Sequence, residues 1–207
     1  MIVQVVGAPG AGKSTILPEL AHKLDAELVD LGSCRGLDGE ILPPAVRFAH
    51  WLVATAANPR LALTLARLPR RGHRTIQEAP ETVRRDRLMR VLSRCGGSFV
   101  VDEGPIHKAV WSAAKSGRRL DPDRFARRLT QPDVVAQVAV APEVAVDRCI
   151  ADGSRATFTQ WSRSDAMVAV VRYEELLGQV TAALGCPTVV VDDVGVAATR
   201  VRNVAGS

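Results

Sequence analysis

Short apolar runs alternate along the chain with longer segments in which apolar residues recur every three or four positions. The short runs, rich in Val, Ile and Leu, predict strands buried on both faces, and the periodic segments predict amphipathic helices. Five strands are expected, over residues 2–6, 26–31, 98–102, 134–141 and 188–192. Because strands and helices alternate, the pattern predicts an α/β fold in which a five-stranded, mostly parallel sheet carries helices on both faces.

A mainly helical insertion occupies the long interval between the second and third predicted strands, over about residues 43–94. Prolines and a glycine break it, so we expect helices over about 44–57, 60–68 and 80–94. Further helices are expected over 106–116, 121–129, 143–152 and 165–184. With 207 residues, the chain is long enough for one domain of this kind, and residues 1–207 are expected to form it.

The first predicted strand runs directly into a glycine-rich segment, residues 7–14, that matches the complete phosphate-binding pattern G-x-x-x-x-G-K-[ST]. We expect a nucleoside triphosphate to be bound by the loop and the turn after it: Gly7, Ala8, Pro9, Gly10, Ala11, Gly12, Lys13, Ser14 and Thr15. Lys13 should act in catalysis by reaching the β- and γ-phosphates, and the Ser14 hydroxyl should coordinate Mg²⁺. Pro18 predicts a kink or a late start in the helix that follows, because proline lacks the N–H of a helical turn.

The net charge of +5 is unevenly distributed. Between Arg60 and Arg94 the chain has ten arginines and only three acidic residues, an excess of seven positive charges. Such a cluster could bind an anionic substrate or nucleic acid, or it could simply keep helix faces solvated.

The four cysteines are far apart, with no C-x-x-C spacing, so buried, reduced thiols are favoured over a zinc site or disulfides. They are Cys34, Cys95, Cys149 and Cys186. The first residues lack the basic start of a signal peptide, and no stretch of about 18 apolar residues is present. These features predict a cytoplasmic protein that does not span a membrane.

Two carboxylates, Asp102 and Glu103, end the third predicted strand. Ligands of open α/β sheets bind at the carboxyl ends of the strands, so both acids are catalytic candidates. Asp102 could hold Mg²⁺ or accept a proton from an acceptor hydroxyl. Glu103 could share that role, or it could cap the helix that follows. The sequence leaves open which of the two acids is the base.

Arginines also mark a polar segment over residues 148–163, after the fourth strand. A lid that carries guanidinium groups onto the phosphates would have this composition, and closing it would exclude water. Arg155 is the strongest candidate, in binding and in catalysis, and Arg148 is the next for nucleotide binding. The alternative is an exposed loop whose arginines have no such role.

Taken in order, these features resemble the nucleoside and nucleoside-monophosphate kinases among the P-loop proteins, nearest to the thymidylate-kinase-like and deoxynucleoside-kinase-like members. The resemblance covers most of the chain, but only the phosphate loop is a sharp motif, so this would be a divergent member. It implies the three-layer α/β/α P-loop NTPase fold, with adenine between the arginine segment and residues 193–196. In that group the third strand ends in an acid followed by arginine; here Asp102 matches the acid, and Glu103 stands in place of the arginine.

The resemblance further implies that the insertion forms the acceptor pocket. Phe48 and Trp51, three residues apart, could stack on a substrate or pack in the core. The candidates for binding an anionic group are Arg47, Arg84 and Arg87. His107 could approach the acceptor or serve a structural role.

The function favoured by the sequence is a Mg-ATP-dependent phosphotransferase that acts on a small molecule, such as a nucleoside, a nucleotide or another hydroxyl metabolite. The first alternative is a P-loop NTPase that acts as a switch or a partner-binding ATPase, although the guanine-binding pattern N-K-x-D is absent. The second is a kinase of nucleic-acid ends, which only the charge supports. A homodimer is compatible with the family resemblance.

Overall fold

The computed structural model describes residues 1–31, 49, 52–53, 55–56, 58–66, 78–117, 119–152 and 161–206. Its five strands form one sheet in the order β2-β3-β1-β4-β5, and every neighbouring pair is parallel. The strands are β1 (Ile2–Val6), β2 (Glu27–Asp30), β3 (Phe99–Asp102), β4 (Val134–Gln137) and β5 (Thr188–Val190). The predicted α/β fold is therefore confirmed.

The strand order places the first strand of the chain at the centre of the sheet, where the direction of winding reverses. Gln4 of β1 is level with Val101 of β3 on one side and with Val135 of β4 on the other. The carboxyl ends of β1 and β3 therefore lie side by side. In open α/β sheets, ligands bind where the strand order reverses in this way.

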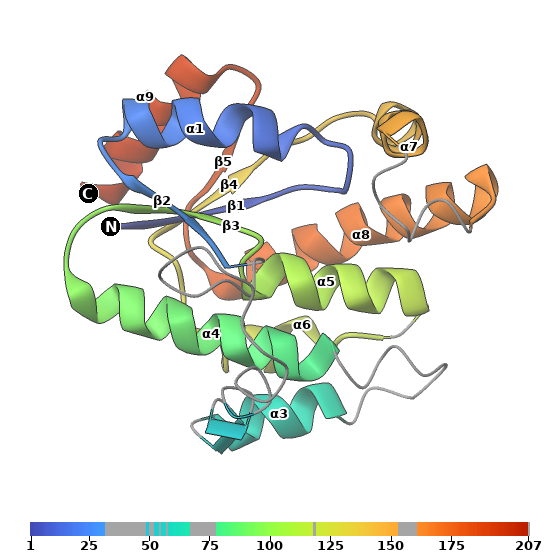
Figure 1. The fold of residues 1–207 in the computed structure, drawn as a ribbon, viewed down its shortest axis with the longest axis horizontal. Coiled ribbons are helices and arrows are strands. Elements are labelled where there is room, and N and C mark those ends of the chain that lie inside the picture. The colour runs from blue at the N-terminus through green and yellow to red at the C-terminus, as the bar shows by residue number, and fades with distance from the viewer. Residues whose placement is uncertain are drawn as a thin grey trace.

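Helices cover both faces of the sheet, giving three layers (Figure 1). One face carries α1 (Lys13–Lys23) and α9 (Val194–Ala205), and the other carries α4 (Glu78–Cys95), α5 (Pro105–Ser116) and α8 (Arg163–Leu184). The remaining helices are α3 (Pro59–Ala66), α6 (Pro122–Ala126) and α7 (Pro142–Asp152).

The core is divided by the sheet because alternate residues of a strand point to opposite faces. Val3 and Val5 of β1 pack with Leu20 of α1 on one side. Val6 packs on the other side, in a cluster that includes Ile106 of α5 and Tyr173 of α8. All five residues of β1 are buried, as expected for a central parallel strand.

Local signals explain where the main helices begin and end. Pro105 occupies the first turn of α5, and Gly117 ends it in the left-handed conformation, with φ of 68°. In α8 the Ser162 hydroxyl accepts the N–H of Asp165 as an N-cap, and Gly185 ends the helix with φ of 70°. These boundaries fix the positions of His107 and Tyr173, which meet between the two helices.

Several boundaries differ from those predicted. The segment predicted as a strand over 134–141 pairs only as far as Gln137, where its ladder with β5 ends. α9 was not predicted, because its buried residues are small; its N-cap is Asp193, whose carboxylate accepts the N–H of Val196. The expected late start of α1 is wrong, since the helix begins at Lys13 and runs through Pro18. Most of the predicted helix over 44–57 lies outside the described residues.

The three cysteines in the described ranges are free thiols, as expected, but only Cys149 is buried. Cys95 is exposed near the C-terminal end of α4, so the expectation of a buried thiol was wrong there. None of the described helices is both long enough and apolar enough to traverse a bilayer.

Candidate active site

The phosphate loop connects β1 to α1 through a tight turn that only glycine can form at one key position. Gly10 has φ of 82°, and a Cβ atom there would lie 2.1 Å from the carbonyl oxygen of Ala145 in α7. The N-cap of α1 is Gly12, which has no side chain to cap the first turn. The uncapped N–H groups and the helix dipole therefore suit this end of α1 to an anion.

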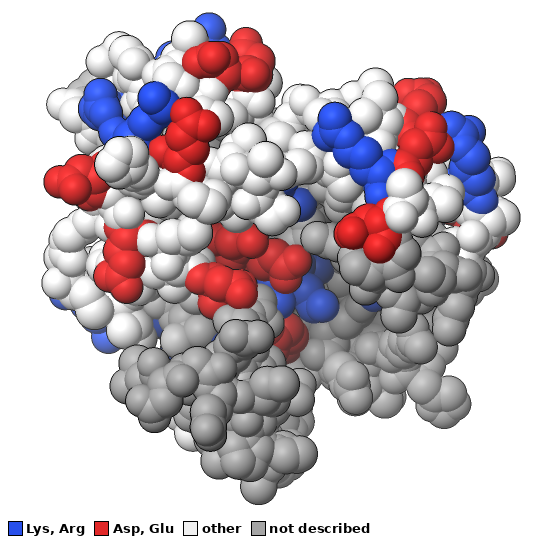
Figure 2. All heavy atoms as spheres, turned by 45° about the horizontal axis from the view of Figure 1, so that its top comes forward, with Lys and Arg blue, Asp and Glu red and all other residues white. Residues whose placement is uncertain are grey.

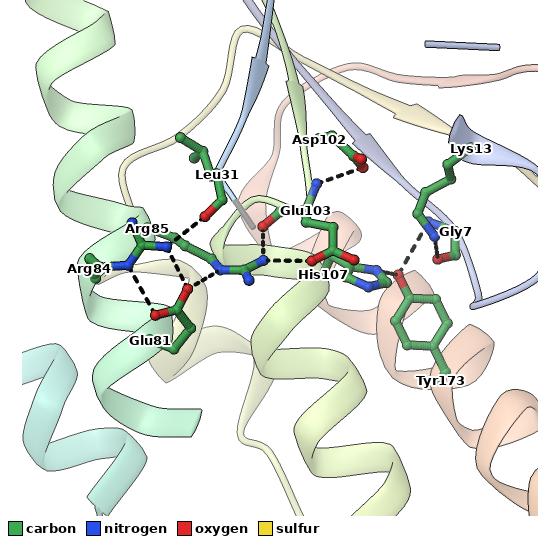
Figure 3. Close-up of polar contacts among 10 residues, drawn as sticks. All are labelled: Gly7, Lys13, Leu31, Glu81, Arg84, Arg85, Asp102, Glu103, His107 and Tyr173. Carbon is green, nitrogen blue, oxygen red and sulfur yellow. Dashed lines mark hydrogen bonds and ion pairs between the residues drawn. The ribbon is translucent and has the colours of Figure 1, made fainter. Parts of the chain in front are cut away.

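Lys13 lies along this loop as a buried cation. Its Nζ donates to the carbonyl oxygens of Gly7, at 2.8 Å, and Ala8, at 3.1 Å (Figure 3). The Lys13 residue is only 6% exposed, whereas Ser14 and Thr15 in the same turn are exposed. The loop thus combines a positive charge at its centre with a hydroxyl that a metal ion can reach.

Asp102 ends β3 next to the loop, on the α1 side of the sheet. Val101 packs against Met89 on the α4 side, so the alternation of the strand directs Asp102 to the other face. The Asp102 Oδ1 accepts the N–H of Glu103 at 2.8 Å. Burial raises the pKa of Asp102, with further contributions from the charges of Glu103 and Asp30, and the positive charge of Lys13 opposes this shift.

Glu103 faces α4 rather than the helix that follows it. Its φ is 48°, a left-handed conformation rare outside glycine, and its carbonyl oxygen accepts a hydrogen bond from Arg85 Nη1. The same Nη1 lies 3.3 Å from the Glu103 carboxylate. The N-cap residue of α5 is Gly104, so the alternative in which Glu103 caps that helix is not observed.

Arg84 and Arg85 of α4 hold the carboxyl ends of two strands (Figure 3). Arg84 Nη2 donates to the carbonyl oxygen of Leu31, just after β2, at 2.7 Å, and Arg85 holds Glu103 after β3. Glu81 lies between them and binds both guanidinium groups, at 2.6 and 3.0 Å. Burial acts to raise the pKa of Glu81, but the two arginines together outweigh it and hold that pKa below its usual value.

α7 supports the loop from the side and contributes an arginine. Arg148 is exposed on this helix, and its Nη1 lies 3.7 Å from the position that a Cβ on Gly12 would take. Arg163, at the start of α8, makes a two-pronged ion pair with Asp147, at 2.9 and 3.2 Å. Of the two arginines described in this segment, Arg148 lies at the phosphate loop and Arg163 is paired with Asp147. Arg155 lies outside the described residues.

His107 is buried in α5, one turn after the acid pair, and contacts Tyr173 of α8. Its Nδ1 lies 2.8 Å from the Tyr173 hydroxyl, and the rings meet edge to face with centroids 5.5 Å apart. The Tyr173 hydroxyl also accepts the N–H of Gly7 at 3.2 Å. His107 is thus joined to the phosphate loop through Tyr173, a contact that fits the structural role left open by the sequence.

The other acceptor candidates are not brought into this cluster by the described structure. Arg47, Phe48 and Trp51 lie outside the described residues. Arg84 is occupied by Glu81 and Leu31. Arg87 is exposed. It follows Arg85 by two residues, a rotation of about 200° along a helix, so it lies on the opposite side of α4 from Arg85.

Three residues at the site were missed from the sequence: Asp30, Tyr173 and Glu174. Asp30 ends β2 level with Asp102, and its position at the end of the second predicted strand could have identified it. Glu174 accepts a hydrogen bond from Gln137 Nε2 at 3.2 Å, and burial raises the pKa of its carboxyl, a shift that the nearby Ala8 N–H opposes. Tyr173 and Glu174 lie in the middle of a long predicted helix, where no local signal marks them.

Near the middle of the face in Figure 2, acidic side chains gather beside basic ones that lie deeper in the surface. No group of three or more metal-ligating side chains that could hold an ion occurs among the described residues. A magnesium ion here would need ligands from the nucleotide in addition to Ser14 and Asp102.

Solved structures of kinases share this fold. Deoxyadenosine kinase from M. mycoides with bound dATP matches with a TM-score of 0.58 at 17% identity, covering 100% of both chains. Shikimate kinase from Bacteroides thetaiotaomicron matches with a TM-score of 0.52 at 16% identity, covering 100% of this chain and 99% of that one. No family model and no curated protein sequence matches the chain. The chain therefore shares the fold of these P-loop kinases, at 16–17% sequence identity.

Proposed function

We propose that this chain is a Mg-ATP-dependent phosphotransferase that moves the γ-phosphoryl group of ATP to a hydroxyl of a small molecule. The observation that carries the proposal is Asp102, an acid electrostatically coupled to Lys13 beside a complete phosphate loop. The loop accounts for triphosphate binding, and a carboxylate with a raised pKa is suited to accept a proton. The shared fold of nucleoside and shikimate kinases supports the same class of reaction.

In this reaction the acceptor oxygen forms a bond to the γ-phosphorus while the bond to the β–γ bridging oxygen breaks and ADP leaves. Lys13 and Arg148, with Arg155, would stabilise charge on the transferred group. The hydroxyl proton would pass to Asp102, while Glu103 remains paired with Arg85. The Ser14 hydroxyl fits a magnesium ion by its chemistry, and Asp102 would hold the ion only through a water molecule, which leaves its carboxylate able to accept the proton. The ion would neutralise phosphate charge.

The acceptor would bind on the β2–β3 side of the loop, where Asp30 and Asp102 are level with one another. The helical insertion, with Arg47, Phe48 and Trp51, would cover it. A nucleoside, a nucleotide or another hydroxyl metabolite is compatible with this arrangement. The arginine cluster gives weaker support to a nucleic-acid acceptor, since Arg84, Arg85 and Arg90 are paired with acidic side chains.

Transfer of label from γ-labelled ATP tests the proposal. Purified protein is incubated with Mg²⁺ and pools of nucleosides, nucleotides, sugars or amino alcohols, and label should enter one pool. Lys13→Ala and Asp102→Asn should each reduce this transfer by about 100-fold or more, because they remove a charge contact and the proton acceptor. Asp192→Asn is the matched control: its Oδ1 accepts the next N–H at 2.9 Å, as in Asp102, but it follows β5.

Label released only as free phosphate, at the same rate in every pool, would reject the kinase for those acceptors and favour an NTPase switch. Loss of transfer in Asp192→Asn as large as in Asp102→Asn would reject the role assigned to Asp102.

A further inference from the structure

Two consecutive residues of α8 face two consecutive N–H groups of the phosphate loop. The Tyr173 hydroxyl accepts the Gly7 N–H at 3.2 Å, and the Ala8 N–H is close enough to the Glu174 carboxylate to lower its pKa. Neither contact belongs to the phosphate-binding pattern, in which these residues supply only the start of the turn. The loop is therefore tied to a helix more than 160 residues further along the chain.

The carbonyl oxygens of the same two loop residues are held from the opposite direction by Lys13 Nζ, at 2.8 and 3.1 Å. If Lys13 turns toward the phosphates of a bound nucleotide, these carbonyl contacts weaken. The contacts with α8 are made by the N–H groups of the loop rather than by the carbonyl oxygens that Lys13 holds. They can keep the start of the loop in place while the lysine moves.

Both acceptors on α8 are themselves held in position. Tyr173 is fully buried, with its hydroxyl 2.8 Å from His107 Nδ1 and its ring edge to face with Trp111, at a centroid distance of 6.0 Å. Burial raises the pKa of the Tyr173 hydroxyl and keeps it neutral, so that the group retains its proton while it contacts His107 and accepts from Gly7. Glu174 is half-buried and is held by Gln137 at the end of β4.

We propose that Tyr173 and Glu174 are positioning residues for the nucleotide: they anchor the start of the phosphate loop to α8 and so set the affinity for the triphosphate. The inference rests on the proposed binding of ATP at this loop. Charged groups near the anchor are Lys13 of α1, which acts on Glu174, and Glu103 after β3, which acts on Tyr173; His107 of α5 completes its polar surroundings. Replacing Tyr173 with Phe, or Glu174 with Ala, would remove a group that faces an N–H of the loop and would leave that N–H without its partner.

Binding of Mg-ATP to the full chain, measured by calorimetry, tests the anchor. Tyr173→Phe and Glu174→Ala should each weaken binding about tenfold, because a buried donor without a partner costs roughly that factor. Glu174→Gln should recover most of the affinity lost in Glu174→Ala, since an amide oxygen can still accept from Ala8.

Thr181→Val provides a matched control. It also removes a buried hydroxyl from α8, but that hydroxyl bonds to the carbonyl oxygens of Leu177 and Gly178. Eight residues along a helix correspond to about 12 Å, so Thr181 is remote from the loop. This variant should lower the melting temperature and keep wild-type affinity for ATP.

Steady-state kinetics should show the same selectivity. Tyr173→Phe and Glu174→Ala should raise KM for ATP and leave KM for the acceptor unchanged. If Tyr173→Phe and Glu174→Ala bind ATP as tightly as the wild type does, the anchor is rejected and the proposed function stands. An equal loss of affinity in Thr181→Val would also overturn it, by showing a general effect of weakening α8. Wild-type protein that binds no ATP would overturn the proposed function and the anchor with it.

Discussion

Two aspartates of the same sheet share a local geometry and differ in their surroundings. Asp102 and Asp192 each accept the N–H of the next residue, at 2.8 and 2.9 Å. Burial raises the pKa of Asp102, whereas the hydrogen bond from the Asp193 N–H lowers the pKa of the exposed Asp192. An acid whose pKa is raised by folding destabilises the folded state once it is ionised, and one whose pKa is lowered stabilises it.

Asp102→Asn should therefore increase the free energy of unfolding at neutral pH, even though it should reduce phosphoryl transfer. The gain should be full above the folded pKa of Asp102 and should vanish as the pH falls to about 3.9, the unfolded value. Asp192→Asn should give no gain at any pH. Urea unfolding of the three proteins between pH 4 and pH 8 would show this, and a gain for Asp102→Asn that is independent of pH would contradict it.

For individual residues, the sequence predicts a site whose members are neighbours along the chain. It does not predict contacts between residues that only folding brings together. Eight neighbouring residues carry the phosphate-binding pattern, so residues 7–14 could be assigned to it without a structure. Glu103 could be placed at the end of β3, but its pairing with Arg85 of α4 depends on how a helix packs against the sheet. Tyr173 and Glu174 are further from the loop in sequence, and no pattern connects them to it.

At the scale of elements, one buried carboxylate joins the insertion to the rest of the fold. Asp86 of α4 is fully buried; its Oδ1 accepts the N–H of Thr130 at 2.6 Å, and its Oδ2 accepts Nδ2 of Asn58 at 3.0 Å. Asn58 in turn caps α3, because its Oδ1 accepts the N–H of Leu61. Asp86 thus links α4 to the start of α3 and to the segment after α6.

Replacing Asp86 with Ala should lower the free energy of unfolding by about 2–4 kcal/mol, because it leaves two buried donors without their acceptor. Arg90→Ala is the matched control: it removes only the exposed end of an i,i+4 ion pair with the same carboxylate, worth less than about 0.5 kcal/mol. Thermal unfolding of both variants makes the comparison. An equal loss in the two would show that Asp86 does not join these elements.

The elements themselves were largely predictable, and the exceptions have physical reasons. The inner strands β1, β3 and β4 are largely buried and give continuous apolar runs, whereas the edge strands β2 and β5 are largely exposed and give shorter runs that were still recognised. α9 was missed because Ala197 and Ala198 bury little side chain and give a weak periodic signal. Of the two outcomes expected from Pro18, the late start of α1 is wrong, since the helix begins at the phosphate loop and runs through that residue.

At the scale of the whole molecule, the candidate site draws residues from β1 to α8 to one edge of the sheet. Lys13, Asp102 and Glu174 come from three separate helices and strands, and Lys13 influences the pKa of both acids. Both chain termini lie at the other end of the sheet (Figure 1). The candidate site is therefore assembled from elements that are far apart in the sequence, and a tag at either terminus would lie away from it.

Mg-ATP should accordingly stabilise the whole chain against unfolding. A ligand present at 100 times its Kd, and bound only by the folded state, raises the free energy of unfolding by about 2.7 kcal/mol. For a chain of this size that corresponds to an increase of roughly 5–10 °C in Tm. Differential scanning fluorimetry with and without Mg-ATP measures it, and Lys13→Ala should lose most of the increase because the lysine no longer meets the phosphates. An equal increase in wild type and Lys13→Ala would show that ATP binds elsewhere on the molecule.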